Sequence, residues 1–173
     1  DAMQVANDYI CAQLPKKPSA EEVARRVQML SGEVAIPAIR IYSQGHDSDV
    51  TAEHRLRLYQ GLQFFNHAFQ KAYPSKLNAE QPEVYCVGAR WEIDPQISAM
   101  LAHTLNLKQI AARNDPNVLI QSGESEKGIV LPASTKILCV SIFHHAPAAQ
   151  IRLLKYNLEQ QYPDLKIIFA TWG

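Results

Sequence analysis

Runs of positive charge, paired cysteines and long apolar segments are all scarce in this chain of 173 residues. Lys plus Arg equals Asp plus Glu at 17 each, and no basic run is longer than Lys16-Lys17. A nucleic-acid-binding protein concentrates positive charge, so we expect no nucleic-acid partner. No apolar run approaches the ~20 residues of a membrane span, and no signal-peptide pattern is visible. Cys11, Cys86 and Cys139 are odd in number and far apart, which predicts reduced thiols of a cytosolic protein.

The composition is that of a folded protein, with a hydrophobic fraction of 47%. The chain starts at Asp1 without a methionine and ends after an apolar segment at Gly173. We expect both ends to be cuts in a longer protein. The pattern along the chain predicts two modules, which are a helical module with its linker over residues 1–79 and an α/β domain over residues 80–173, truncated at its C-terminus.

The helical module is indicated by helix-start signals and by apolar spacing. Ser19 is a suitable N-cap, and Glu22 three residues later completes a capping box. A helix is also expected over residues 2–14, and "SQGHDSD" at 43–49 predicts an interhelical loop because it lacks the spacing of a calcium loop. One apolar helix face is predicted because apolar residues recur at intervals of four, three and four positions, at Leu58, Leu62, Phe65 and Phe69.

The second module alternates strand and helix patterns. Strands are expected at "VYCVGA" (84–89), "VLIQS" (118–122), "KILCVSIF" (136–143) and "LKIIFATWG" (165–173). Helices are expected at 94–106 and 146–162, each with a proline in its first turn. This order predicts a parallel sheet with right-handed crossovers and helices on its faces.

The first candidate site is "GARWEID", residues 88–94, at the carboxyl end of the first strand. A dinucleotide-binding loop needs G-x-G-x-x-G, and only Gly88 is present. Two interpretations stay open here. Trp91 packs the turn against the helical module, or Arg90, Trp91 and Glu92 line a ligand crevice.

The second candidate is "VSIFHHAP", residues 140–147, at another strand end. His144 and His145 either line the strand-to-helix turn or do metal or acid-base chemistry with Glu92 or Asp94. Ser141 lacks a G-x-S-x-G elbow and lies in a buried strand, so its hydroxyl bonds backbone or faces the crevice. We expect no metal and no catalytic residue.

The module order resembles the cobalamin-binding modules of methionine synthase-type and light-sensing regulator proteins, in which a helical bundle precedes a flavodoxin-like domain. The motif G-D-x-H-x-x-G of that family corresponds to residues 88–94, where Trp91 replaces the cobalt-ligating histidine and Asp94 replaces the second glycine. Residues 141–143 approximate its S-x-L signature, and 170–171 replace its Gly-Gly pair. The resemblance implies a flavodoxin-like, cobalamin-binding-like sheet that has lost the cofactor motif.

The chain is also similar to soluble extensions of bacterial membrane permeases of the autoinducer-exporter type. "EVAIPAI" and the stretch from "VSIFHHAPAAQ" to "DLKIIFATWG" carry this resemblance. It implies a place on the cytoplasmic side of the bacterial inner membrane and a role in regulating or assembling a transporter. The membrane-embedded portion of the same polypeptide would be the partner.

These patterns together predict a non-catalytic regulatory domain that binds an unknown small ligand or a partner in a crevice formed by Arg90, Trp91, Glu92, Ser141 and the two histidines. The alternative is a sensor that binds cobalamin without a histidine ligand; no cofactor is otherwise expected. An enzyme using a histidine with Glu92 or Asp94 is a third hypothesis. The apolar face that begins at Leu58 must be buried, either within the chain or in a homo-oligomer.

Overall fold

The computed structural model describes residues 19–37, 52–75, 77, 80–120, 129–144 and 146–172. The expected helix at 2–14, the loop at 43–49 and the candidate His145 lie outside the described residues. Within the described part, none of the helices combines the length and apolarity needed to cross a bilayer.

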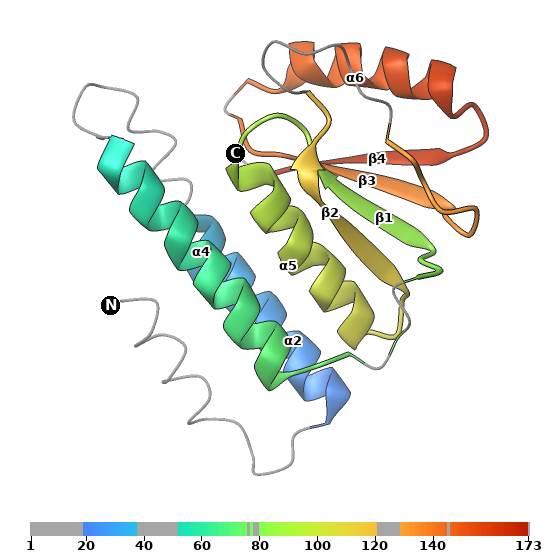
Figure 1. Ribbon diagram of the computed structural model, residues 1–173. Helices are drawn as coiled ribbons and strands as arrows, with labels where there is room; N and C mark the ends of the chain where they lie inside the picture. Colours follow the sequence, from blue (N-terminus) through green and yellow to red (C-terminus); the bar gives the residue numbers. More distant parts are fainter. Residues whose placement is uncertain are drawn as a thin grey trace.

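The described chain begins with helices and then alternates strand and helix (Figure 1). The first helices are α2 (Ala20–Leu30), the π-helical turn η1 (Ser31–Ala35) and α4 (Ala52–Ala72). They are followed by β1 (Val84–Gly88), α5 (Ile93–Leu107), β2 (Ala112–Val118), β3 (Ile137–Ile142), α6 (Ala148–Gln161) and β4 (Lys166–Thr171).

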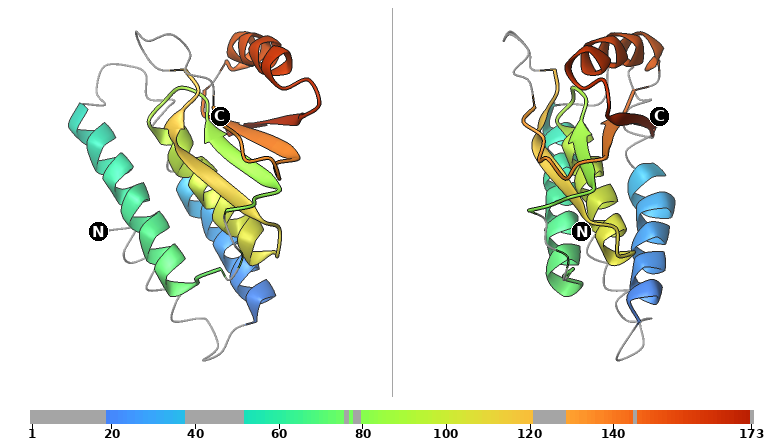
Figure 2. Two further views of the ribbon diagram at one scale, coloured as in Figure 1. Left: turned by 45° about the vertical axis from the view of Figure 1, so that its right-hand side comes forward. Right: turned by 90° about the vertical axis from the view of Figure 1, so that its right-hand side faces the viewer.

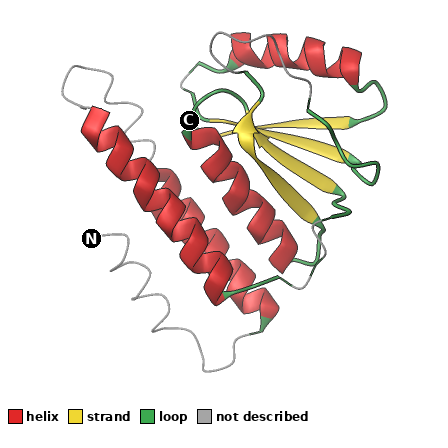
Figure 3. Cartoon of the chain, in the orientation of Figure 1, coloured by secondary structure: helices red, strands yellow, loops and turns green. Residues whose placement is uncertain are grey.

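The four strands form one parallel sheet in the order β2-β1-β3-β4. In the sheet, β2 lies on one side of β1, whereas β3 and β4 lie on its other side. Right-handed crossovers therefore place α5 and α6 on opposite faces of the sheet, as Figures 2 and 3 show. The expected α/β class is confirmed, with a flavodoxin-like arrangement of a parallel sheet flanked by helices.

The two central strands are buried on both faces because their side chains alternate between two helical layers. Tyr85 and Val87 of β1 pack with Leu154 and Leu158 of α6. Cys86, one position away, faces the side covered by α5. Burial on both faces thus explains why the segments "VYCVG" and "ILCVSI" are apolar at consecutive positions.

The helices before the sheet lie in the same layer as α5 (Figure 2). The capping box at the start of α2 is confirmed, since the Ser19 backbone N–H donates to the Glu22 carboxylate and the Glu22 N–H donates to Ser19 Oγ. The apolar face of α4 is also confirmed, with Leu62, Phe65 and Phe69 buried. A single core joins the buried residues of α2, α4 and α5, and Leu58 packs against it.

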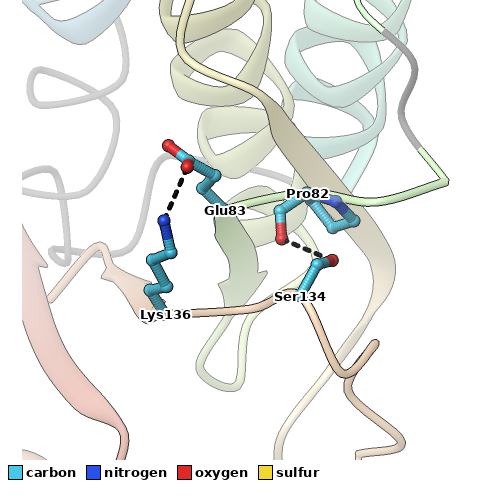
Figure 4. Close-up of polar contacts among 4 residues, drawn as sticks. All are labelled: Pro82, Glu83, Ser134 and Lys136. Atoms are coloured by element: carbon cyan, nitrogen blue, oxygen red, sulfur yellow. Dashed lines mark hydrogen bonds and ion pairs between the residues drawn. The ribbon is translucent and has the colours of Figure 1, made fainter.

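Polar contacts align the amino ends of β1 and β3 (Figure 4). The Lys136 ammonium lies 2.8 Å from the Glu83 carboxylate, and the Ser134 hydroxyl donates to the carbonyl oxygen of Pro82 at 3.0 Å. Both partners in each contact come from segments just before the strands. These contacts fix the register with which the two central strands begin.

The second strand is not where the sequence places it. The expected strand at 118–122 is wrong over its described residues, since β2 begins at Ala112 and ends at Val118, and residues 121–122 lie outside the described part. Asn106 at the end of α5 explains the start, because its side-chain amide bonds both the N–H and the carbonyl oxygen of Ala112, each at 2.8 Å. The polar composition of this strand, including Pro116, is compatible with its place at the edge of the sheet.

Candidate functional site

The turn from β1 into α5 is built on close backbone approach. A Cβ at Gly88 would lie 2.6 Å from Cδ and N of Pro95, which real Cβ atoms do not tolerate. Gly88 is therefore required by the packing of the first turn of α5 against the end of β1. This explains the glycine of the "GARWEID" motif without a cofactor.

Asp94 holds this turn to the neighbouring strand. Its Oδ2 accepts the backbone N–H groups of Arg90 and Trp91 at 2.9 and 3.0 Å, and its Oδ1 accepts that of Phe143 at 2.9 Å. The side chain is 0% exposed. Burial raises the pKa of the Asp94 carboxyl, while the backbone hydrogen bonds act to lower it. Both carboxylate oxygens are thus engaged in joining the ends of β1 and β3.

Phe143 fills the space between the end of β3 and the helices. Its side chain is buried in the core shared by α2, α4 and α5. The order β2-β1-β3-β4 puts the topological switch point between β1 and β3, which is where open α/β sheets usually bind ligands. Here Asp94 and Phe143 occupy that position, so it is closed by the chain itself.

An open hollow of about 340 Å³ lies on the other side of the β1 end, beside β2. The pairing of β1 with β2 is irregular here, since Cys86 pairs with Asn114 but Gly88 pairs with Val118. Residues 115–117 bulge away from β1. The lining comes from the β1–α5 turn, the β2 bulge and α4, and consists of Tyr59, Arg90, Glu92, Pro95, Pro116, Asn117, Val118 and Ile120.

The lining of this hollow combines opposite charges with apolar surface. Arg90 supplies a guanidinium, Glu92 a carboxylate and Asn117 an amide. The Tyr59 hydroxyl accepts a hydrogen bond from Gln63 Nε2 at 2.9 Å, so its own O–H is oriented by α4. The volume is at the lower end of small-molecule pockets, which span roughly 300–1,000 Å³. The hollow thus offers a cationic, an anionic and an amide group beside apolar surface.

The three candidates of the first loop are separated by the structure. Arg90 and Glu92 line the hollow together, whereas Trp91 does not. The Trp91 side chain is 46% exposed, and the Arg90 guanidinium lies 5.2 Å from its ring centroid, a cation–π distance. Trp91 is therefore a surface residue that supports Arg90.

The candidates of the third strand lie apart from the hollow. Ser141 is 0% exposed on β3, and its Oγ finds no hydrogen-bond partner among the described residues. His144 is half-buried, and its Nδ1 accepts the backbone N–H of Ala146 at 3.0 Å, which is the turn-lining role. No group of three or more His, Cys, Asp or Glu side chains gathers as a metal site within the described residues.

Sequence reasoning missed the β2 side of the hollow. Asp115 organises it, accepting the Tyr85 hydroxyl at 2.9 Å with one oxygen and the Asn117 backbone N–H at 2.9 Å with the other. The signal was present as the turn formers of "NDPN", residues 114–117. A proline inside a strand beside a candidate loop indicates a bulge, and bulges are common next to sites.

Fold and hollow together define the class as a parallel α/β domain with a helical layer and a polar hollow at the carboxyl edge of its sheet. Protein-family models, curated proteins and solved structures include no match to this chain.

The residues at the switch point do not fit cobalamin. Trp91 stands where the resembling family has its cobalt-ligating histidine. Phe143, just after β3, is a bulky aromatic residue buried against the helices, where a wide tetrapyrrole would require small side chains. Asp94, in the place of the second glycine, has both oxygens committed to the turn and to β3.

Proposed function

We propose that this chain is a non-catalytic binding domain with a regulatory role in a bacterial membrane permease, and that it takes a small ligand or a partner segment in the hollow beside β2. The observation that supports the binding role is the lining of the hollow, whereas the permease context rests on the sequence resemblance alone. The lining places Arg90 and Glu92 beside an apolar wall at the carboxyl edge of a parallel sheet. Among its described lining residues, none is a histidine, serine or cysteine.

A ligand screen with a matched variant tests the binding role. Small metabolites, nucleotides and corrinoids are mixed with the chain, and the unfolding midpoint is measured, because a ligand specific to the native state raises it. A genuine ligand of the hollow raises the midpoint of the wild type but not of Arg90→Ala. The matched control is Arg152→Ala on exposed α6, away from the hollow, which should keep the response. A ligand whose effect survives Arg90→Ala, Glu92→Gln and Asn117→Ala would overturn the assignment to this hollow.

Cobalamin is the comparison ligand in the same experiment. After mixing with methylcobalamin or adenosylcobalamin and desalting, the protein is expected to be colourless. A coloured protein would favour the alternative of a cobalamin sensor without a histidine ligand.

The permease context is tested separately by reading the complete gene. The proposal expects apolar membrane spans encoded upstream of Asp1, with this domain following them. A complete reading frame without such spans would overturn the permease role while leaving the binding role open to the screen.

A further inference from the structure

Two cysteines face each other in the middle of the sheet. Cys86 of β1 and Cys139 of β3 are direct partners in the parallel register, and both point to the α5 side. They are 0% and 6% exposed, and both are free thiols. Neighbouring strands are about 4.8 Å apart. That spacing lies within the Cα separation of disulfides, roughly 4.4–6.8 Å.

The two sulfurs are close enough that each thiol perturbs the ionisation of the other. The neighbouring Cys86 thiol lowers the pKa of Cys139, whereas burial raises it. The neighbouring Cys139 thiol, followed by burial, raises the pKa of Cys86. Ionisation of one thiol of the pair is thus favoured over ionisation of both. An attacking thiolate beside a resolving thiol is the arrangement of reactive cysteine pairs.

A second hollow lies beside the core cluster that contains this pair. It measures about 330 Å³ and lies between the segment after α4, helix α5 and the edge strand β2. Its lining includes Ala102 and Ala112, which belong to the same small core cluster as the two cysteines. Asn114, also in the lining, is the register partner of Cys86. The hollow and the two cysteines therefore share the neighbours Ala102 and Ala112, although neither cysteine lines the hollow itself.

We propose that Cys86 and Cys139 form a dithiol site, reached through the α5–β2 hollow, that a small hydroperoxide converts to a disulfide. This site is independent of the ligand hollow on which the proposed function rests. The two differ in lining, and neither cysteine lines the ligand hollow.

The chemistry balances with hydrogen peroxide as the oxidant. The Cys139 thiolate attacks one peroxide oxygen, the O–O bond breaks, and the leaving hydroxide takes a proton to become water. Cys139 is then a sulfenic acid. The Cys86 sulfur attacks the Cys139 sulfur, the S–O bond breaks, and the oxygen leaves as a second water. Two thiols are oxidised and one peroxide is reduced to two waters.

The test uses the full chain with Cys11→Ser, which leaves only the proposed pair. The folded protein is treated with hydrogen peroxide and quenched, its thiols are counted after denaturation, and its peptides are mapped by mass spectrometry. The expected result is loss of both thiols together and one linked peptide containing Cys86 and Cys139. Two thiols remaining, or two separate sulfinic acids without a link, would overturn the proposal. Cys139→Ser is the matched control and should accumulate no linked peptide.

The urea dependence of the reaction tests the route. Oxidation through the hollow should proceed at a rate independent of urea at concentrations well below the unfolding transition. A rate that rises with urea in step with the equilibrium population of unfolded chain would show that the thiols react only after global unfolding. That outcome would overturn the route. The measurement needs only the Cys11→Ser chain, so it does not depend on the folding of the second variant.

Discussion

The two sides of the β1 carboxyl end differ sharply. Toward β3, the carboxylate of Asp94 bonds three backbone N–H groups and Phe143 is packed into the helical core. Toward β2, the strand pairing is irregular and a hollow of about 340 Å³ remains. The closed side is made of buried groups that satisfy one another. The open side carries exposed Arg90 and Glu92.

The difference shows that a sheet with this strand order can be closed at its switch point and open beside its edge strand. A strand order that reverses between β1 and β3 ordinarily leaves a crevice there. In this chain the crevice is filled from both strands, and the bulge in the edge strand opens space one strand away. The closed side is expected to carry stability and the open side to carry binding.

Replacing Asp94 with alanine should give the largest loss of stability. The backbone N–H groups of Arg90, Trp91 and Phe143 would lose their acceptor in a buried place, and each such loss costs ~1–3 kcal/mol. We expect the free energy of unfolding in urea to fall by about 3–5 kcal/mol. Asp115→Ala on the open side is the comparison, expected to cost about 1 kcal/mol. Equal costs for the two carboxylates would contradict the contrast between the sides.

Phe143→Ala should cost somewhat less, about 3–4 kcal/mol, because it leaves a cavity in a packed core. Urea unfolding again measures the change. Val118→Ala, at the half-buried wall of the open hollow, provides the matched truncation and should cost about 1 kcal/mol or less. If Phe143→Ala were as mild as Val118→Ala, the switch point would not be closed by packing.

Local signals in the sequence were enough for most of the fold. The capping box at Ser19, the apolar face through Leu62 and the apolar runs of β1 and β3 each follow from short-range patterns that the structure confirms. The position of β2 did not follow. Its register depends on Asn106 reaching Ala112 across a turn, and its polar side chains are tolerated because it is an edge strand.

The candidate site was only half predictable for a related reason. Arg90 and Glu92 follow a buried strand, so their place at the carboxyl edge could be expected. Which strand they would face depends on how the turn is braced, and Asp94 does this through backbone contacts that no pattern reveals. Tyr59 joins the lining from a helix about thirty residues earlier, through packing alone.

Alkaline pH should weaken the open side through Tyr85. Burial, followed by its hydrogen bond to Asp115, raises the pKa of Tyr85 to about 12. The folded pKa lies above the ordinary value of ~10, so this stabilisation is present below pH ~10 and is lost as the pH rises through about 12.

The measurement is urea unfolding at a series of alkaline pH values for the wild type and Tyr85→Phe. Lysines and other tyrosines titrate in both proteins, so the difference between the two curves isolates Tyr85. The wild type should lose more stability between pH ~9.5 and ~11.5 than the variant. Parallel curves would show that Tyr85 titrates alike in the folded and unfolded chains.

The smallest effect is expected at Trp91, on the exposed rim of the open side. Its ring is 46% exposed and lies 5.2 Å from the Arg90 guanidinium, and cation–π pairs at exposed sites contribute ~0.5–1 kcal/mol. Trp91→Ala should therefore lower the free energy of unfolding by less than about 1 kcal/mol. A double-mutant cycle with Arg90→Ala isolates the pair, and its coupling should be about 0.5 kcal/mol. Absence of coupling would mean that Trp91 does not hold Arg90 at the hollow. A coupling several times larger would mean that the rim is as rigid as the closed side, and the contrast between the two sides would then fail.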